Sequence, residues 1–424
     1  MINYAKKGVV VAATVLTLSG CGESSSSSTG SDFQSSDSGQ TTTPAVTEFD
    51  EAQLVANLVD NVITPTFVLF NQQAQTQTQA VANYCQAEIQ SVQESSEEAI
   101  ALRAQAQQAW LDTMAGWQQA EMMQMGPLLD NAGQLRNQIY SWPTFSRCGI
   151  DQDVVYNQDG VINQDQNRPY AISERTATRR GLFAIGHVLF NEQLAHHCSV
   201  ANDALADWNN RTDLARRQAR CEFAVVASED VLSSSAQLLQ AWQGDNGFAN
   251  ELKNTGQSGS RFSTTHEALN HISDALFYID TIVKDKKLAE PIGIFSNSCG
   301  ASACPEDVES LDAKSSLDNI RNNLAAFEAL IMGNLDAEQG GTGFDDFLDA
   351  EQAQATKTRL VEGIAALKAT LNSIDSSLAD LLIDNEQQVR DVHGQVKVLT
   401  DELKNDFINE LALELPTTSA GDND

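Results

Sequence analysis

Apolar residues recur at three- and four-residue spacing along most of the chain, which is the periodicity of amphipathic helices. The pattern is strong between Glu51 and Asn137, resumes at Ser173 and continues through Leu194. Residues 141–169 lack it and are predicted to form a loop. This half of the chain should therefore consist of helices separated by one long polar connection.

The same spacing predicts more helices in the second half of the chain, at 213–242, 263–287, 311–332, 346–373 and 376–413. Residues 244–260 are polar and rich in glycine, and they interrupt the pattern. No alternating strand run of useful length follows the N-terminal segment. The predicted fold class is all-α, with two tandem helical bundles at 48–255 and 256–415 and an acidic tail at 416–424.

The N-terminus has the pattern of an export signal. Lys6 and Lys7 precede an apolar run, which ends in the small residues before Cys21. Residues 1–20 are too short to remain as a membrane span and are predicted to be a signal peptide. The stretch Leu18-Ser19-Gly20-Cys21 resembles the bacterial lipobox, in which cleavage leaves the cysteine as an acylated N-terminal residue. We therefore expect Cys21 to be a lipid anchor.

The segment after the anchor is a predicted tether. Residues 21–47 are rich in Ser, Thr and Gly, so they cannot bury a core and should form a flexible linker. Gly22 stands where an aspartate often retains lipoproteins in an inner membrane. The predicted location is therefore the periplasmic face of the outer membrane, with the bilayer as a partner through the acyl chains.

Charge narrows the range of partners. The chain has 424 residues and a formal net charge of −32. Only eight of its residues are proline. An acidic surface repels phosphate backbones, so nucleic acid is not an expected partner. The low Pro and Gly content argues against a turn-rich β protein.

The chain contains seven cysteines, and six of them follow Cys21. An even number in an oxidising compartment indicates disulfides, although six cysteines allow 15 connectivities. The predicted pairs are Cys85–Cys221, Cys148–Cys198 and Cys299–Cys304. A zinc site is the competing interpretation, but the sequence contains no CxxC pair.

No catalytic constellation stands out among the titratable residues. Glu192 lies four residues before His196, so the two would share a helix face if the helix continued that far. One carboxylate and one imidazole are only half of a metal site, and the sequence has no HExxH. No catalytic residue and no metal ligand is assigned on this basis.

Several blocks of the sequence resemble the imelysin-like family of exported bacterial proteins and lipoproteins. They occur in the family's order over residues 50–410. The blocks are Asn61–Phe67, Ala109–Pro127, Ser141–Pro143 with Cys148–Asp153, Arg180–Phe190, Arg220-Cys221 with Ala241-Trp242, Ala275–Gly293, Ser315–Leu324 and Gly343–Leu348.

This resemblance implies two packed helical bundles, a periplasmic or surface location and a link to iron or haem acquisition. It also implies a peptidase label, which rests largely on a GxHxxE motif. Here the aligned positions are Gly181, Phe183 and Gly186, so the motif's His and Glu are absent. Phe and Gly side chains can neither coordinate a metal nor transfer a proton. His187 is nearby but displaced in register.

We therefore expect a non-catalytic binding or accessory protein of iron or haem uptake, with iron or haem as the ligand class and uptake proteins as partners. This face should bind no stoichiometric zinc or iron. Two alternatives stay open. One is a metallopeptidase with a relocated site using His187 or the Glu192/His196 pair, and the other is a surface-anchored helical interaction protein unrelated to iron.

Overall fold

The computed structural model describes residues 49–199, 203–336 and 339–419. The predicted signal peptide, the linker with Cys21 and the end of the acidic tail lie outside these residues. The described part is helical and contains no named strand. The predicted all-α fold class is therefore confirmed.

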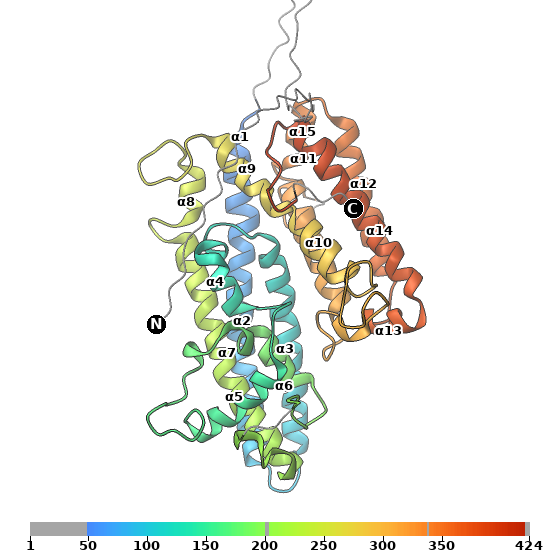
Figure 1. Cartoon of the computed structure of the whole chain (residues 1–424). Coiled ribbons are helices and arrows are strands. Elements are labelled where there is room, and N and C mark those ends of the chain that lie inside the picture. Colours follow the sequence, from blue (N-terminus) through green and yellow to red (C-terminus); the bar gives the residue numbers. More distant parts are fainter. Residues whose placement is uncertain (1–48, 200–202, 337–338, 420–424) are drawn as a thin grey trace, which may run out of the picture. The chain divides into compact units, whose positions relative to one another are not determined.

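The first half of the described chain runs through eight α-helices joined by short 3₁₀ turns (Figure 1). They are α1 (Glu51–Asn57), which passes through a π-helical segment η1 (Leu58–Ile63) into α2 (Thr64–Gln90), then α3 (Glu97–Met122), α4 (Asp130–Ile139), α5 (Arg147–Asp159), α6 (Gly181–Phe190), α7 (Asp213–Gln243) and α8 (Phe248–Lys253). The 3₁₀ turns are η2 (Gly126–Leu128), η3 (Ile172–Glu174), η4 (Ala177–Arg179), η5 (Asp203–Leu205) and η6 (Trp208–Asn210).

The second half continues with helices of varied length (Figure 1). They are α9 (Thr265–Leu276), the π-helix η7 (Ile279–Ala289), the 3₁₀ turn η8 (Pro305–Asp307), α10 (Ser316–Met332), α11 (Phe344–Ala350), α12 (Gln354–Asn372), α13 (Leu378–Asp384), α14 (Glu386–Glu402), the π-helix η9 (Leu403–Phe407) and α15 (Ile408–Glu410).

Several helices begin at a residue whose hydroxyl group caps the first turn. The Ser96 side chain accepts from the backbone N–H of Ala99 before α3, and Ser146 accepts from Gly149 before α5. Such caps satisfy backbone donors that have no partner inside the helix, and each contributes about 1 kcal/mol. The start of α5 is thus encoded locally.

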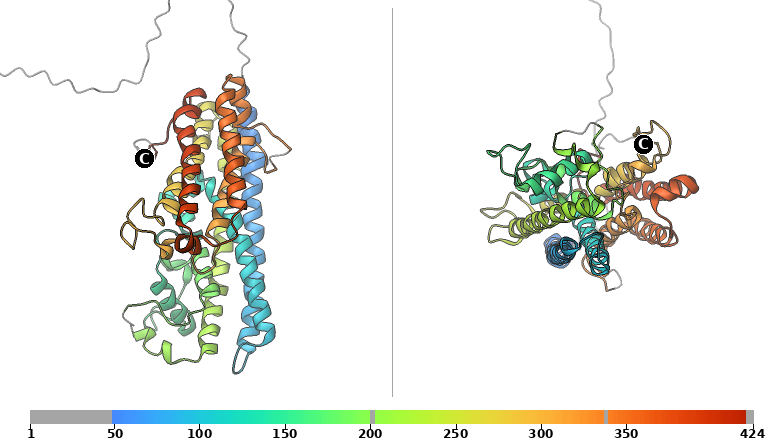
Figure 2. Two further views of the ribbon diagram at one scale, coloured as in Figure 1. Left: turned by 90° about the vertical axis from the view of Figure 1, so that its right-hand side faces the viewer. Right: turned by 90° about the horizontal axis from the view of Figure 1, so that it is seen from below.

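The core of the first half lies between three long helices. Helix α2 packs against α3 on one side and α7 on the other, and Figure 2 shows α2 and α3 side by side along their length. Phe67 of α2 meets Trp242 of α7 edge to face with ring centroids 5.1 Å apart, and the ring centroids of Phe70 and Trp117 of α3 are 5.2 Å apart. These large buried rings dominate the apolar area that stabilises the three-helix layer.

The second half packs directly on the first. Helix α12 contacts both α10 and α14, and α10 also packs along α3. The described residues from Phe49 onward therefore form one compact unit. The division into bundles at 255/256 stays a prediction.

Several expectations about local structure were wrong. The predicted helices at 346–373 and 376–413 are each interrupted, at 351–353 and at Asn385. Residues 147–159 of the predicted loop form α5, because Ile150, Val154 and Val155 give that stretch a buried helical face. The glycine-rich stretch 244–260 contains α8, whose Phe248 is buried against Trp242. Helix α6 begins at Gly181 and ends at Phe190, so it neither starts at Ser173 nor reaches Leu194.

All three predicted disulfides are present. Cys85–Cys221 joins α2 to α7, Cys148–Cys198 joins α5 to the loop after α6, and Cys299–Cys304 closes a local loop. The first two tie together segments that are far apart in the sequence, which restricts the unfolded chain most.

The stretch Glu51–Gln90 is long and apolar enough to cross a membrane by length and composition, with a mean hydropathy of 1.3 in its most apolar window. Half of that window is buried inside the described part of the protein. Its buried side is the one that carries Phe67 and Phe70, as expected for a core helix.

Candidate functional site

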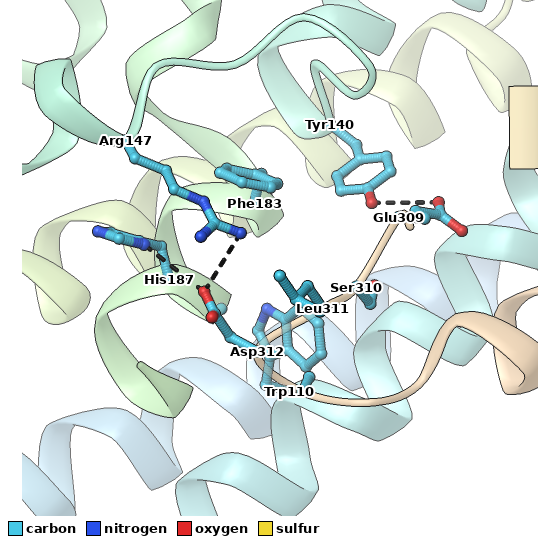
Figure 3. Close-up of a pocket in the computed structure, with 11 residues that line it drawn as sticks. Trp110, Tyr140, Arg147, Phe183, His187, Glu309, Ser310, Leu311 and Asp312 are labelled. Atoms are coloured by element: carbon cyan, nitrogen blue, oxygen red, sulfur yellow. Dashed lines mark hydrogen bonds and ion pairs between the residues drawn. The ribbon is translucent and has the colours of Figure 1, made fainter. Parts of the chain in front are cut away.

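The degenerate motif lies on α6, between α3, α5 and a loop of the second half at 309–313. Figure 3 shows this small pocket, in which His187 of α6 lies next to Asp312 of the loop and Tyr140 lies next to Glu309. Gly181 starts the helix with φ +76°, and a Cβ there would lie 2.5 Å from the Ile139 carbonyl oxygen. This close approach requires glycine, so the first motif position has a backbone role.

Gly186 is held by packing against Trp110. A Cβ at this position would lie 2.6 Å from Cζ2 of the Trp110 ring. That ring is fixed, because its Nε1 donates a hydrogen bond of 2.9 Å to the Leu182 carbonyl. The space that a glutamate would need at the last motif position is therefore filled by an indole.

Phe183, at the motif's histidine position, is also in an apolar contact. Its ring stacks on Phe145 with centroids 3.9 Å apart, and its side chain is buried. Neither motif position offers a donor atom, so the family's metal chemistry does not fit this face.

His187 is buried between two carboxylates. Its Nε2 lies 3.1 Å from Asp151 Oδ1 on α5, and its Nδ1 faces Asp312 Oδ2 at 3.7 Å. The latter distance is too long for a hydrogen bond, and the buried Nδ1 has no hydrogen-bond partner. Asp312 is also 3.7 Å from Arg147, a contact drawn in Figure 3.

His197 reaches the same aspartate from the loop after α6. Its backbone N–H donates to Asp151 Oδ2 at 2.6 Å, and its Nδ1 lies 3.1 Å from the same oxygen. The rings of His187 and His197 meet edge to face at 4.8 Å. Asp151 thus connects two imidazoles that lie ten residues apart in the sequence.

These contacts decide the charge of Asp151. Its burial by itself raises the pKa of the carboxyl group, but hydrogen bonds from His187 and His197 outweigh burial and hold the pKa well below its usual value. Arg220 is also buried, 3.9 Å from Asp151 Oδ1, and it donates to the carbonyls of Asn191 and Gln193. Burial lowers the pKa of Arg220, and the charge of Asp151 opposes that shift.

The far wall of the pocket is a second buried polar network. Glu309 accepts hydrogen bonds from Tyr140 and Gln118, and Lys287 lies 3.1 Å from its other oxygen. Burial, followed by the charge of Glu309, raises the pKa of Tyr140 well above its usual value. A neutral tyrosine here donates to a carboxylate and joins the two halves of the protein.

The room between these walls is small. The cavity has a volume of about 20 Å³, which is enough for about one water molecule. Pockets that enclose organic ligands measure about 300–1,000 Å³. In this conformation the pocket can take a water or a small ion and cannot enclose a peptide or a porphyrin.

The predicted site residues are partly brought together. Within the described ranges one group of histidine and carboxylate side chains has ligand atoms close enough to share an ion, and it consists of Asp151, His187 and His197. Glu192 and His196 do not belong to it, because α6 ends at Phe190 and they follow in an irregular loop.

Sequence reasoning missed Asp151 and His197, although a signal was available. Asp151 follows Cys148 by three residues, and His197 directly precedes Cys198. The predicted disulfide between those cysteines already implied that the two side chains lie close together.

Comparison with known proteins places the chain next to one family. The family model described as Imelysin matches residues 63–405. An imelysin-like protein from Psychrobacter arcticum 273-4 has a similar structure, with a TM-score of 0.61 and 16% identity, over 86% of this chain and 96% of that one. No curated protein matches the sequence.

A second similar structure is from Parabacteroides distasonis ATCC 8503 and is named an iron-regulated protein A precursor. Its TM-score is 0.62 at 17% identity, over 85% of this chain and 95% of that one. At such identities the structures show a shared fold, whereas the family model covers most of the sequence. The chain therefore belongs to the imelysin family.

Proposed function

We propose that this chain is a periplasm-facing lipoprotein that acts as a non-catalytic binding or accessory protein in iron or haem acquisition. The observation that carries the proposal is the packing of Phe183 and Gly186. Apolar rings fill the face on which the family's GxHxxE motif would present a histidine and a glutamate. A role in binding fits this face better than hydrolysis does.

The link to iron comes from family membership and from one structural relative. That relative is named as an iron-regulated protein, and it shares the fold over most of both chains. The pocket beside α6 is too small for a porphyrin, so haem or an uptake partner would contact the outer surface of this protein. A free iron ion is small enough to be held within the fold.

The location is part of the proposal. Cys21 follows a lipobox-like stretch and lies outside the described residues, as does the Ser/Thr-rich linker. The acyl chains would hold the helical body close to the bilayer, and the linker would let it reach partners at the membrane.

The test measures protein level and growth under iron limitation. Immunoblots of cells with and without an iron chelator should show strong induction when iron is scarce. A deletion strain should grow poorly on limiting iron or haem, and the wild-type gene should restore growth. Unchanged protein levels together with unchanged growth would support a helical interaction protein unrelated to iron.

A relocated metallopeptidase is the second candidate, and the position of His187 favours it. A catalytic metal needs protein ligands and an open position for water. We expect purified protein supplemented with zinc to leave casein intact. If the wild type cleaves casein and His187→Ala does not, the protein is a peptidase and the proposal of an accessory function is wrong.

A further inference from the structure

We propose that Asp151, His187 and His197 form a binding site for one divalent transition-metal ion. The ligand atoms of the three side chains lie within 4.8 Å of one another. Each imidazole nitrogen that faces Asp151 is 3.1 Å from one of its oxygens. Ligands bound to tetrahedral zinc at about 2.1 Å stand about 3.4 Å apart, so small side-chain shifts suffice.

The donor set selects the class of ion. Two imidazoles with one carboxylate are the ligands of many zinc and non-haem iron(II) sites. Calcium and magnesium prefer oxygen ligands throughout and would find only one here. The site should therefore take zinc, iron(II) or cobalt(II).

A buried nitrogen without a partner supports this assignment. His187 Nδ1 has no hydrogen bond, although Asp312 Oδ2 is only 3.7 Å away. If Nε2 bound a metal, the ring proton would move to Nδ1 and point toward the Asp312 carboxylate. Metal-bound histidines commonly donate their other N–H to a carboxylate, which orients the ring.

The fold holds the three ligands in place from separate elements. Asp151 is on α5, His187 is on α6, and His197 is on the loop that follows α6. The Cys148–Cys198 disulfide ties this loop to α5 next to both Asp151 and His197. Arg220 fixes the start of the same loop through two carbonyl groups. Such preorganisation limits the entropy lost when an ion binds.

The site is open on one side. The side chains of Asp151 and His187 are fully buried, whereas 26% of the His197 side chain is exposed. An ion would enter past His197, and with three protein ligands it would keep a position for water. This inference does not rest on the role in iron uptake, because a metal site could serve stability or another ligand.

The experiment uses the purified mature chain with its disulfides intact. After removal of metal with a chelator, zinc binding is measured by equilibrium dialysis with elemental analysis. Cobalt(II) serves as a second probe, through its visible absorption when bound by few ligands. We expect one zinc per chain and a cobalt spectrum that zinc abolishes.

His197→Ala removes the exposed ligand, and His196→Ala is the matched control from the neighbouring position. Loss of one of three ligands should weaken zinc binding by more than the roughly 10–100-fold typical of outer-shell changes. His196→Ala should bind like the wild type. Circular dichroism checks that both variants are folded, and Asp151→Asn provides a further variant that preserves side-chain volume.

Two results would overturn the metal site. One is a wild-type chain that binds no zinc at micromolar concentration, which would leave the cluster as a structural hydrogen-bond network. The other is equal binding by His197→Ala and His196→Ala. Both readouts are independent of iron-dependent growth, so they can fail while the proposed function stands, and the reverse also holds.

Discussion

At the residue scale, packing explains the residues found in the altered motif. Trp110 fills the space beside Gly186, and its indole N–H is bonded to the Leu182 carbonyl on the same helix, α6. Phe183 extends the apolar contact to Phe145. A helix interior would ordinarily favour alanine over glycine by about 1 kcal/mol, so the close contact with the ring explains the glycine.

We predict that Gly186→Ala destabilises the protein. Its new Cβ would lie 2.6 Å from the ring carbon of Trp110, and overpacking of this kind costs about 1–3 kcal/mol. Gly394→Ala on α14 is the control, because nothing lies within 4 Å of its Cβ position. That variant should gain up to about 1 kcal/mol. Urea unfolding measures both, and equal stability of the two variants would refute the packing explanation.

The raised pKa of Asp274 on α9 leads us to predict that the stability of the protein depends on pH. Burial, followed by the charge of Glu414, raises its pKa from the ordinary value of 3.8 to about 6. A carboxyl group whose pKa is raised by folding contributes stability below its unfolded pKa and loses that contribution as the pH rises through the folded value. The free energy of unfolding should therefore fall as the pH rises from 4 to 6.

The measurement is the melting temperature of Asp274→Asn relative to wild type across that range. The variant should be the more stable protein above pH 6 and should lose this advantage below pH 4. His271 lies 4.0 Å from Asp274, so its own titration is controlled with His271→Asn. A difference between Asp274→Asn and wild type that does not vary with pH would contradict the prediction.

At the element scale, disulfides connect segments that are far apart in the sequence. Cys148–Cys198 spans 50 residues and joins α5 to the loop carrying His197, whereas Cys299–Cys304 spans 5. The longer crosslink removes more freedom from the unfolded chain. It also positions two of the three proposed metal ligands.

We predict a larger stability loss for Cys148→Ala/Cys198→Ala than for Cys299→Ala/Cys304→Ala. Chain entropy gives about 4 kcal/mol for the 50-residue loop and about 2 kcal/mol for the short one. Denaturant titration of the two double variants tests the order. The opposite order would mean that native-state contacts at Cys304 matter more than loop length.

At the scale of the whole molecule, the two halves meet through buried polar groups as well as through α3 and α10. Glu309 of the second half contacts Gln118 and Tyr140 of the first half, and it also neutralises the buried Lys287. A buried acceptor that loses its hydrogen-bond donors costs about 1–3 kcal/mol, so the donors on Gln118 and Tyr140 favour contact between the halves. The small pocket beside α6 exists because of that contact.

Attachment to the membrane is the prediction that concerns the entire chain. If Cys21 is acylated, the wild type should incorporate radiolabelled palmitate and partition into detergent. Cys21→Ser should be released into the soluble periplasm, because the tether is too polar to bind a bilayer. An unlabelled and freely soluble wild type would exclude the lipid anchor.

The sequence by itself determined the helical class and the boundaries of the long helix α7, and it indicated disulfides whose predicted pairing the structure confirmed. These follow from local causes: apolar spacing, capping residues, and a short list of cysteines in an exported chain. It also showed that Phe183 and Gly186 lack the donor atoms of the family motif. Helix α5 could also have been predicted from the sequence, because Ser146 caps it and its apolar residues have helical spacing.

Only the tertiary structure decided which polar groups share a site. Asp151, His187 and His197 come from three elements, and Asp312 comes from the other half of the chain. No periodicity encodes such a meeting, because it depends on how helices pack after they have formed. The end of α6 at Phe190 was decided in the same way. The loop after it is held by Arg220 and by Cys148–Cys198, contacts made across the fold, and these turn His197 toward Asp151.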